Sequence, residues 1–199
     1  MPVASGQEPT PPVSPPRCVT PDTDAYLVAR ILSGDADCYA VLVGRYQDSL
    51  FRYAVGMVRD GDLASDLVQD SFVKAYTSLA SCQDPNRFGA WVFRILVNRC
   101  KDHLKSRRRH TLPLEEDTAV TPDSDNPALS ADRADMRQMV ERALATLPEA
   151  QREAFLLQHL EGRSYEEIAE MLGASVSALK MRVLRAREAL QGLLREFAD

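Results

Sequence analysis

The stretch 164-SYEEIAEMLGASVSALKMRVLRAR-187 is the most informative part of the sequence, because it predicts two short helices joined by a tight turn. In each half, apolar side chains recur at helical spacing and mark an inner stripe: Ile168, Ala169 and Leu172, then Val176, Leu179 and Val183. Gly173 stands where a helix end needs a left-handed residue, and Ser175 is placed to cap the second helix. The stretch therefore predicts a helix-turn-helix.

The second of these helices is strongly basic. Before Glu188 it carries no acid and four positive charges: Lys180, Arg182, Arg185 and Arg187. Such a helix is typical of one that lies against nucleic acid. A helical hairpin with a solvated basic face is the alternative, but the turn residues, the small Ala169 and the one-sided charge all favour DNA binding. The motif leaves the role open, because activators, repressors and initiation factors carry it.

The composition predicts an all-α protein. The chain has 199 residues, 45% of them hydrophobic and only nine of them glycine, and it shows no run of strand-like alternation. Its long segments are rich in Ala, Leu, Arg and Glu, which favour helices. Apolar runs fall short of the roughly 20 residues needed to cross a bilayer, and the N-terminus lacks the order of a secretion signal. We expect a soluble cytoplasmic protein with no membrane insertion.

The charge is unevenly distributed along the chain. The net charge of −5 argues against a nucleic-acid partner, but DNA responds to local patches. Between Arg99 and Arg109, six basic residues face one acid, Asp102. Between Glu115 and Asp125 there are five acids and no base. A basic helix followed by an acidic linker is therefore compatible with DNA binding.

Cysteine and histidine spacing favours neither a metal site nor catalysis. The cysteines stand far apart, with no Cys-x-x-Cys pair and no histidine at ligand spacing: Cys18, Cys38, Cys82 and Cys100. We interpret them as reduced structural thiols, with redox activity as the alternative. No set of nucleophile, base and orienting acid is visible. The sequence predicts no enzyme activity, no metal and no cofactor.

Two small helical domains joined by a flexible linker are predicted. Residues 1–22 hold seven of the twelve prolines and form a disordered tail. Residues 23–109 form the first domain, residues 110–132 the linker and residues 133–199 the second domain. Within the first domain we expect Asp24 to cap a first helix, a third helix over 63–79, a loop over 80–89 and a fourth helix from Ala90. In the second domain, Pro148 is expected in the first turn of a helix, with Leu144, Leu147, Phe155, Leu156 and Leu160 packed against the helix-turn-helix.

Four motifs occur in a telling order and spacing. Residues 66–72 read Asp-Leu-x-Gln-Asp-x-Phe, residues 91–102 read Trp-x-x-Arg-Ile-x-x-Asn-x-x-x-Asp, residues 147–152 read Leu-Pro-x-x-x-Arg, and Ser164 opens Ser-Tyr-x-Glu-Ile-Ala-x-x-Leu-Gly-x-Ser. No single one would suffice. As a set, over roughly residues 24–194, the chain resembles a bacterial sigma factor of the extracytoplasmic-function group of the sigma-70 family. Members of that group keep two domains, regions 2 and 4.

The resemblance implies a polymerase-binding surface on the third helix. It would grip the β′ clamp helices of core RNA polymerase through Asp62, Asp66, Leu67, Gln69 and Asp70. A plain solvated acidic face is the alternative. The family resemblance also implies contact with the polymerase β flap.

The resemblance further assigns the −10 element to the loop before Trp91 and to the fourth helix. A melted strand needs flat apolar surfaces for stacking and donors for its exposed base edges. Phe88 and Trp91 are candidates for stacking, although Trp91 as a core anchor stays open. Hydrogen-bonding candidates are Gln83, Asn86 and Arg87, and candidates for phosphate contact are Arg94, Asn98, Lys101 and Lys105.

The −35 element is assigned by resemblance to the helix-turn-helix. Base-facing candidates are Lys180, Met181, Leu184 and Arg185, phosphate candidates are Arg182 and Arg187, and Ser175 and Ser177 cap the helix, touch phosphate, or do both. Ala178-Leu179 stands where Thr-Val is frequent, and Met181 stands where a small polar residue is usual. The base preference is therefore left open.

The resulting hypothesis is a promoter-specificity subunit in a stress or envelope response, with an anti-sigma factor expected as a further partner. The linker of about 22 residues reaches at most roughly 75 Å, and promoter elements one and a half to two duplex turns apart are on the order of 50–70 Å from each other. One chain therefore reaches both elements. The competing hypotheses are an ordinary helix-turn-helix regulator with a sensing domain, and a polymerase-associated adaptor or sigma antagonist.

Overall fold

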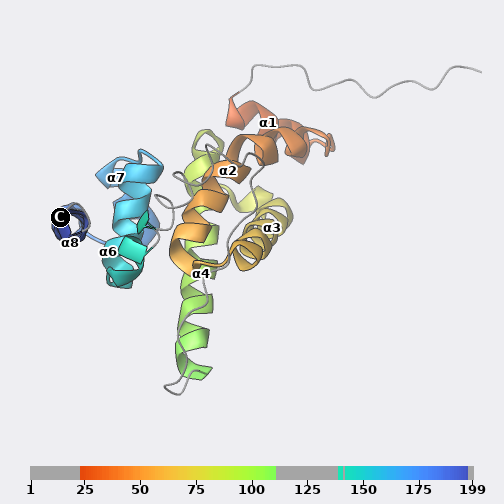
Figure 1. Ribbon diagram of the computed structural model, residues 1–199. Helices are drawn as coiled ribbons and strands as arrows, with labels where there is room; N and C mark the ends of the chain where they lie inside the picture. Colours follow the sequence, from red (N-terminus) through yellow and green to blue (C-terminus); the bar gives the residue numbers. More distant parts are fainter. Residues whose placement is uncertain (1–22, 111–138, 141, 197–199) are drawn as a thin grey trace, which may run out of the picture.

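The computed structural model describes residues 23–110, 139–140 and 142–196 (Figure 1). The proline-rich stretch 1–22 and nearly all of the linker 110–132 lie outside the described residues. Throughout the described part, every regular element is helical and no strand occurs. The predicted all-α class is confirmed. None of the described helices combines the length and the apolar character that a bilayer span requires.

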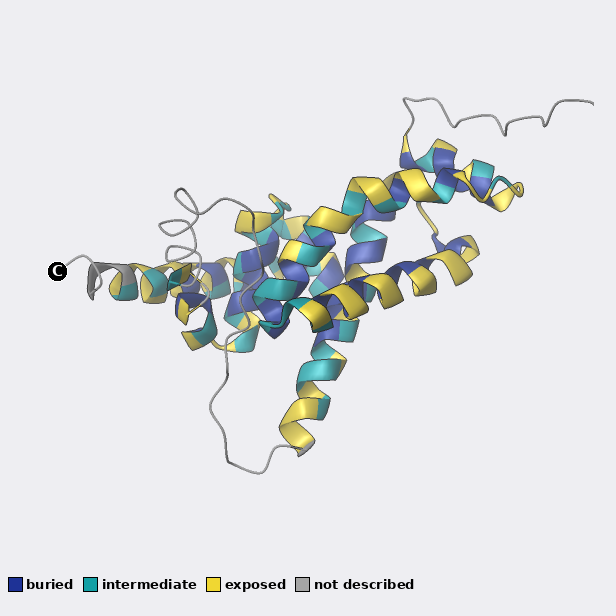
Figure 2. Cartoon of the chain, turned by 45° about the vertical axis from the view of Figure 1, so that its right-hand side comes forward, coloured by how far each residue is buried: buried dark blue, intermediate teal, exposed yellow. Residues whose placement is uncertain are grey.

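The first helical block is built around α2. Its elements are α1 (Asp24–Leu32), α2 (Cys38–Val58), α3 (Gly61–Thr77), the 3₁₀ turns η1 (Leu79–Ser81) and η2 (Pro85–Arg87), and α4 (Phe88–His110). Helix α2 packs against α1, α3 and α4, with Leu42, Leu50 and Phe93 buried among them. The C-terminal turns of α4 project beyond the other helices (Figure 1) and are largely exposed (Figure 2). These turns carry the basic run that ends at Arg109.

Helix starts in this block differ from the predictions in small ways. Thr23, not Asp24, caps α1, since its side chain accepts from the backbone N–H of Tyr26. Asp24 is instead buried and accepts from the side chains of Arg45 and Tyr46. Helix α3 begins two residues early because Asp60 caps it through the N–H of Leu63. Charge-assisted hydrogen bonds from these two donors satisfy the buried Asp24 carboxylate, and the helix cap falls to Thr23.

Helix α4 also begins two residues before the predicted start at Ala90. Gly89, in the first turn of this helix, lies where α4 comes very close to Tyr46 of α2. A Cβ at that position would lie 2.7 Å from Cε1 of Tyr46, closer than side-chain carbons pack. Glycine therefore lets α4 approach α2, and the predicted loop over 80–89 becomes two 3₁₀ turns and the first residues of α4.

The second helical block consists of α6 (Glu149–Phe155), η3 (Leu156–Leu160, one stretch of π-helix), α7 (Tyr165–Leu172) and α8 (Val176–Glu196). Pro148 takes the N-cap position before α6 rather than the first turn. Leu160 is exposed, and Leu157 packs in the core in its place, because the wider π turn rotates the side chains that follow it.

The helix-turn-helix forms as the sequence predicts. Ser164 and Glu167 make a reciprocal capping box at the start of α7. Gly173 ends α7 with a φ of 62°, a left-handed conformation that favours glycine. Ser175 accepts a hydrogen bond of 3.3 Å from the N–H of Ala178 at the start of α8. Ile168, Leu179 and Val183 close the core between the two helices.

The two blocks pack directly against each other. Helices α6 and α7 and the π turn η3 lie against α2 and α4. Leu156 packs against α2 at Gly56, where α2 has no side chain. A Cβ at Gly56 would lie only 2.8 Å from Leu156 Cδ1. The guanidinium of Arg163 lies over the ring of Phe93, 4.8 Å from its centroid. One hydrophobic cluster therefore runs through both blocks.

Candidate functional site

The acidic face of α3 is largely open to solvent. Asp62, Asp66, Gln69 and Asp70 are exposed, while Leu67 on the inner side is buried. Oδ2 of Asp70 lies 2.8 Å from Nη1 of Arg99 on α4. The other two acids therefore present their charge outward, and Asp70 shares its charge with a cation.

An apolar groove runs between α2 and α3 beside this face. Tyr39, Val43, Val68, Phe72 and Tyr76 line it. The Tyr39 hydroxyl donates a 2.7 Å hydrogen bond to the carbonyl of Phe72, and burial raises the pKa of Tyr39 to about 12. The un-ionised Tyr39 phenol and its hydrogen bond therefore tie α2 to α3 along the wall of this apolar groove.

The loop before α4 presents three of its predicted polar residues to solvent, Gln83, Asn86 and Arg87. The carboxylate of Asp84 caps η2, accepting from the N–H of Asn86 at 3.1 Å. This cap fixes the turn that carries Arg87. A short turn with one side-chain cap therefore positions donors next to the start of α4.

Phe88 does not meet the prediction that it offers a stacking surface. Its side chain is 0% exposed, because it occupies the first turn of α4 and points at α2, with its ring 5.8 Å from that of Tyr46. Trp91 is half-buried and lies 5.8 Å from Phe88. The buried Phe88 ring packs beside the Trp91 ring, so Trp91 is the aromatic side chain of this region that remains partly accessible for stacking.

The polar face of α4 carries the four residues predicted at three- and four-residue intervals. Arg94, Asn98 and Lys105 are exposed. Lys101 is half-buried, with its Nζ 2.8 Å from Oε1 of Glu153 on α6. Burial raises the pKa of Glu153, and the Lys101 ammonium works against that rise. Arg94, Asn98 and Lys105 are thus accessible to a ligand, whereas Lys101 is already ion-paired with Glu153.

The outer face of α8 holds most of the residues predicted to contact a groove. Met181 and Leu184 are 49% and 46% exposed, and Lys180, Arg185 and Arg187 are also exposed, with Arg182 half-buried. The ammonium of Lys180 lies over the ring of Tyr165, 5.7 Å from its centroid. Ser175 and Ser177 have their hydroxyls 3.2 Å apart beside the helix start. Large apolar side chains and cations therefore share one solvent-facing surface.

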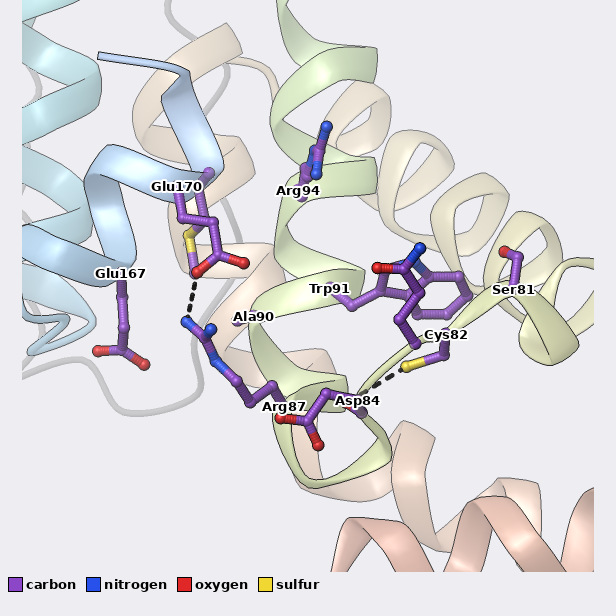
Figure 3. Close-up of a pocket in the computed structure, with 11 residues that line it drawn as sticks. Ser81, Cys82, Asp84, Arg87, Ala90, Trp91, Arg94, Glu167 and Glu170 are labelled. Carbon is purple, nitrogen blue, oxygen red and sulfur yellow. Dashed lines mark hydrogen bonds and ion pairs between the residues drawn. The ribbon is translucent and has the colours of Figure 1, made fainter. Parts of the chain in front are cut away.

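Acidic residues of the second block meet the basic residues of the first, which the sequence did not predict. Oε2 of Glu170 on α7 lies 2.6 Å from Nη2 of Arg87, as Figure 3 shows. The other pairs across the contact are Lys101–Glu153, Arg108–Glu149 and Arg52–Glu161. On α7, Glu170 follows the pattern of an ordinary exposed helix face, so only the tertiary contact reveals its partner.

A cavity of about 300 Å³ lies at this contact (Figure 3). From the first block it is lined by Arg87, Trp91 and Arg94, and from the second by Glu167, Glu170 and Met171. The N–H of Ser164 bonds to Glu167, and this hydrogen bond lowers the pKa of Glu167, so the carboxylate stays charged. Arg87 on the loop thus faces these carboxylates, whereas the indole ring of Trp91 points away from them, toward Ser81 and Cys82 (Figure 3).

Three cysteines of the described part are buried: Cys38, Cys82 and Cys100. Burial raises the pKa of Cys100 to about 12 and also raises that of Cys82. Thiols in this state are inert at neutral pH. The described residues contain no group of three or more His, Cys, Asp or Glu arranged to hold a metal ion.

Comparison with known families gives one match for each helical block. Residues 42–110 match the family described as Sigma-70 region 2, and residues 137–190 match the family described as Sigma-70, region 4. Two curated relatives match nearly their whole length. The RNA polymerase sigma-H factor of Pseudomonas aeruginosa is 33% identical over 89% of this chain and 99% of the relative. The ECF RNA polymerase sigma-E factor of Escherichia coli K12 is 35% identical over 84% of this chain and 92% of the relative.

Two solved structures are similar to the fold. CnrH in complex with the cytosolic domain of CnrY aligns with a TM-score of 0.68 and 32% identity, over 88% of this chain and 99% of that chain. The sigma factor RpoE of Bartonella quintana, in complex with the anti-sigma factor NepR, aligns with a TM-score of 0.66 and 29% identity, over 79% of this chain and 96% of that chain.

Proposed function

Because this chain belongs to the extracytoplasmic-function sigma factors of the sigma-70 family, a non-enzymatic group that binds core RNA polymerase and promoter DNA, we propose which surface meets each partner. The first block is assigned to core polymerase and the −10 element, and the second to the −35 element. One observation carries the assignment. An exposed basic helix and a separate loop with a half-exposed tryptophan belong to the same chain.

The polymerase surface is assigned to the acidic face of α3 together with the groove beside it. Asp62, Asp66 and Gln69 supply charge and hydrogen-bonding capacity. The exposed groove residues Val73 and Tyr76 supply apolar area at its edge. An apolar centre with a polar rim is the usual construction of a protein interface, and two exposed acids suit a basic helical partner such as the clamp helices.

The −10 surface is assigned to η2, Trp91 and the outer face of α4. One base of the melted strand stacks on Trp91, and the donors of Gln83, Asn86 and Arg87 meet base edges. The backbone then follows α4, where Arg94 and Lys105 neutralise phosphates. Phe88 is removed from the set of contacts, since its buried ring supports Trp91 instead.

The −35 surface is assigned to the outer face of α8. Arg185 suits bidentate bonds to guanine, while Met181 and Leu184 suit thymine methyl groups in a major groove. Arg182 and Arg187 suit phosphates, which set register without reading sequence. Ser175 remains a cap, and its hydroxyl beside Ser177 is available to a phosphate at the helix N-terminus.

An anti-sigma factor is assigned as a further partner. Both similar solved structures carry such a chain or a fragment of a second protein on the sigma factor. Since sigma factors act together with RNA polymerase on DNA, the cytoplasm is the proposed location. The regulated response is assigned, from the family alone, to stress or the cell envelope.

The test is reconstitution with purified bacterial core RNA polymerase. Co-elution with core in size-exclusion chromatography, followed by run-off transcription from genomic fragments with defined start sites, supports the assignment. Aligned start sites then give the promoter sequence. Tight binding to intact duplex DNA without any binding to core would instead favour an ordinary helix-turn-helix regulator.

A further inference from the structure

The groove between α2 and α3 is an aromatic channel at the surface of the first block. It encloses about 1060 Å³. The ring of Tyr39 lies 4.9 Å from that of Tyr76 and 6.5 Å from that of Phe72, measured between centroids. Val73 and Tyr76 are 58% and 45% exposed. An exposed apolar channel of this kind marks an interaction surface.

Part of the groove wall on α2 consists of small residues. They are Ala36, Ala40 and Gly44, and a Cβ at Gly44 would meet nothing within 4 Å. Exposed amide donors stand along the groove at Gln47 and Gln69. A polyproline II helix makes no hydrogen bonds of its own, so its carbonyls are free to accept from such donors, and its rings pack on aromatic side chains. The groove therefore has the chemistry that binds a proline-rich segment.

The chain itself contains such a segment. Residues 1–22, which lie outside the described residues, hold seven of the twelve prolines. Within them, residues 9–16 form a proline run that reads Pro-Thr-Pro-Pro-Val-Ser-Pro-Pro. Proline fixes φ near −65°, so a run of this composition loses little conformational entropy on entering a polyproline II helix. Pro12 and Pro15 are three residues apart, which places both on one face of that helix, since it has three residues per turn.

Charge and chain length are compatible with binding in the same chain. Arg17 directly follows the proline run, and Asp37 lines the groove with an exposed carboxylate that does not cap α2. The seven residues 17–23 join the run to α1 and reach at most roughly 25 Å. Asp24 is held against α2 by Arg45, so the connection starts at α2 and has to pass around one helix of about 10–12 Å in diameter.

We propose that the proline run, residues 9–16, binds in the groove between α2 and α3 of the same chain and competes there with core polymerase. The competition rests on the proposed function, because it takes the groove as part of the polymerase surface. A tethered segment acts at an effective concentration in the millimolar range, so a weak contact is enough to fill the groove. Core polymerase then binds only the fraction of molecules whose groove is free.

Cys18 offers a way to observe the docking directly. It lies two residues beyond Pro16, and the other three cysteines of the chain are buried: Cys38, Cys82 and Cys100. A thiol-reactive nitroxide can therefore be attached to Cys18 of the full native chain, with mass spectrometry to confirm a single label. The nitroxide broadens the NMR signals of protons close to it.

Paired variants of the full chain test the docking. Pro12→Ala with Pro15→Ala removes two prolines from the run, and Pro2→Ala with Pro21→Ala removes two from outside it as the control. The nitroxide should broaden the methyl signals of Val73 in the wild type and in the control, and the run variant should lose most of that broadening. No broadening at Val73 in the wild type, or equal broadening in the two variants, would overturn the docking.

A mixed sample tests whether the docking occurs within one chain. The nitroxide is placed on a chain without isotope label, and the NMR signals of Val73 are recorded from an isotope-labelled chain without nitroxide. We expect no broadening in this mixture. Broadening as strong as in the singly prepared protein would place the proline run in the groove of a second copy, and the proposal for the same chain would be wrong.

Affinity for core polymerase tests the competition. We expect the run variant to bind core about three- to tenfold more tightly than the control, which corresponds to a groove filled in about two thirds to nine tenths of the free molecules. Broadening at Val73 with equal core affinity in the two variants would uphold the docking and refute the competition. Core binding without any broadening would refute the docking alone, and no core binding by any variant would refute the proposed function.

Discussion

Asp70 of α3 and Arg99 of α4 form an ion pair across two helices, with 2.8 Å between Oδ2 and Nη1. The pair stands at the edge of the proposed polymerase surface and neutralises one of its acids. Asp66, one helical turn earlier, is exposed and makes no ion pair with any described residue. Most of the outward negative charge of α3 is therefore concentrated at Asp62 and Asp66.

Reversing the charge of Asp66 should weaken binding to core polymerase. Asp66→Arg places a cation where a basic partner docks, and like charges across an interface cost several kcal/mol, so we expect a loss of at least about 100-fold in affinity. Surface plasmon resonance with immobilised core measures it. Glu166→Arg, the same reversal on an exposed position of α7, is the control. Unchanged core affinity in Asp66→Arg with a helical circular dichroism spectrum would contradict the assignment of α3.

Substitution of Trp91 should impair promoter opening, whereas substitution of Phe88 should lower the free energy of unfolding. Trp91→Ala removes the stacking surface, worth about 1–3 kcal/mol per base, so strand opening at the −10 element should fall about 5- to 150-fold. Trp91→Phe keeps a ring and is the matched control. Permanganate reactivity of thymines in the −10 element, in the presence of core, measures opening.

Phe88→Ala should instead unfold the first block more easily. Its fully buried ring makes the cost about 3–5 kcal/mol, seen as a lower midpoint in chemical denaturation. If Trp91→Ala proves as destabilising as Phe88→Ala and leaves strand opening unchanged per folded molecule, Trp91 is a core anchor and the stacking role is wrong.

Trp91 and Phe88 also show how much of the structure can be predicted from the sequence. Periodicity predicts the helices, and the turn residues Gly173 and Ser175 predict the helix-turn-helix, because these signals are local. The start of α4 carries a weaker local signal. A helix that begins at Ala90 leaves Phe88 in the loop, whereas the observed start at residue 88 places Phe88, Val92 and Leu96 on one buried stripe.

Contacts between the two helical blocks lie beyond such local signals. The pairing of Glu170 with Arg87 joins residues more than eighty positions apart. By sequence alone, Glu170 has the pattern of a solvated helix face and Arg87 that of a polar loop. Asp24 shows the same limit at shorter range. Its helix-cap position is a common local pattern, but burial beside Arg45 and Tyr46 gives it a tertiary role that the sequence does not display.

Two arginines of α8 should differ in the kind of loss they cause. Arg185→Ala removes a proposed base contact, so it should cost about 1–3 kcal/mol and relax the preference at one −35 position. Arg187→Ala removes a proposed phosphate contact and should weaken all sequences alike, with the salt slope reduced by about 1. Holoenzyme binding to a −35 library at several salt concentrations measures both. Loss of core affinity in Arg185→Ala would contradict its place on the DNA surface.

Cys100 should make the free energy of unfolding depend on pH above neutrality. Burial, followed by the charge of Glu153, raises the pKa of its thiol to about 12, against about 8.5 for an unfolded cysteine. Since the folded pKa is raised, the stabilising contribution is fully present below about pH 8.5 and is lost as pH rises toward 12. Between pH 7.5 and 9.5 we expect a loss of about 1.4 kcal/mol from this one group.

Chemical denaturation of wild type and Cys100→Ala at the two pH values measures this contribution. The variant loses packing at both, so only the difference between the pH values is informative, and that difference should shrink by about 1.4 kcal/mol in the variant. Iodoacetamide at pH 8 should leave Cys100 unmodified in the native protein and alkylate it after denaturation. Rapid native alkylation of Cys100, or an identical pH dependence in wild type and variant, would contradict a buried, un-ionised thiol on α4 near Glu153.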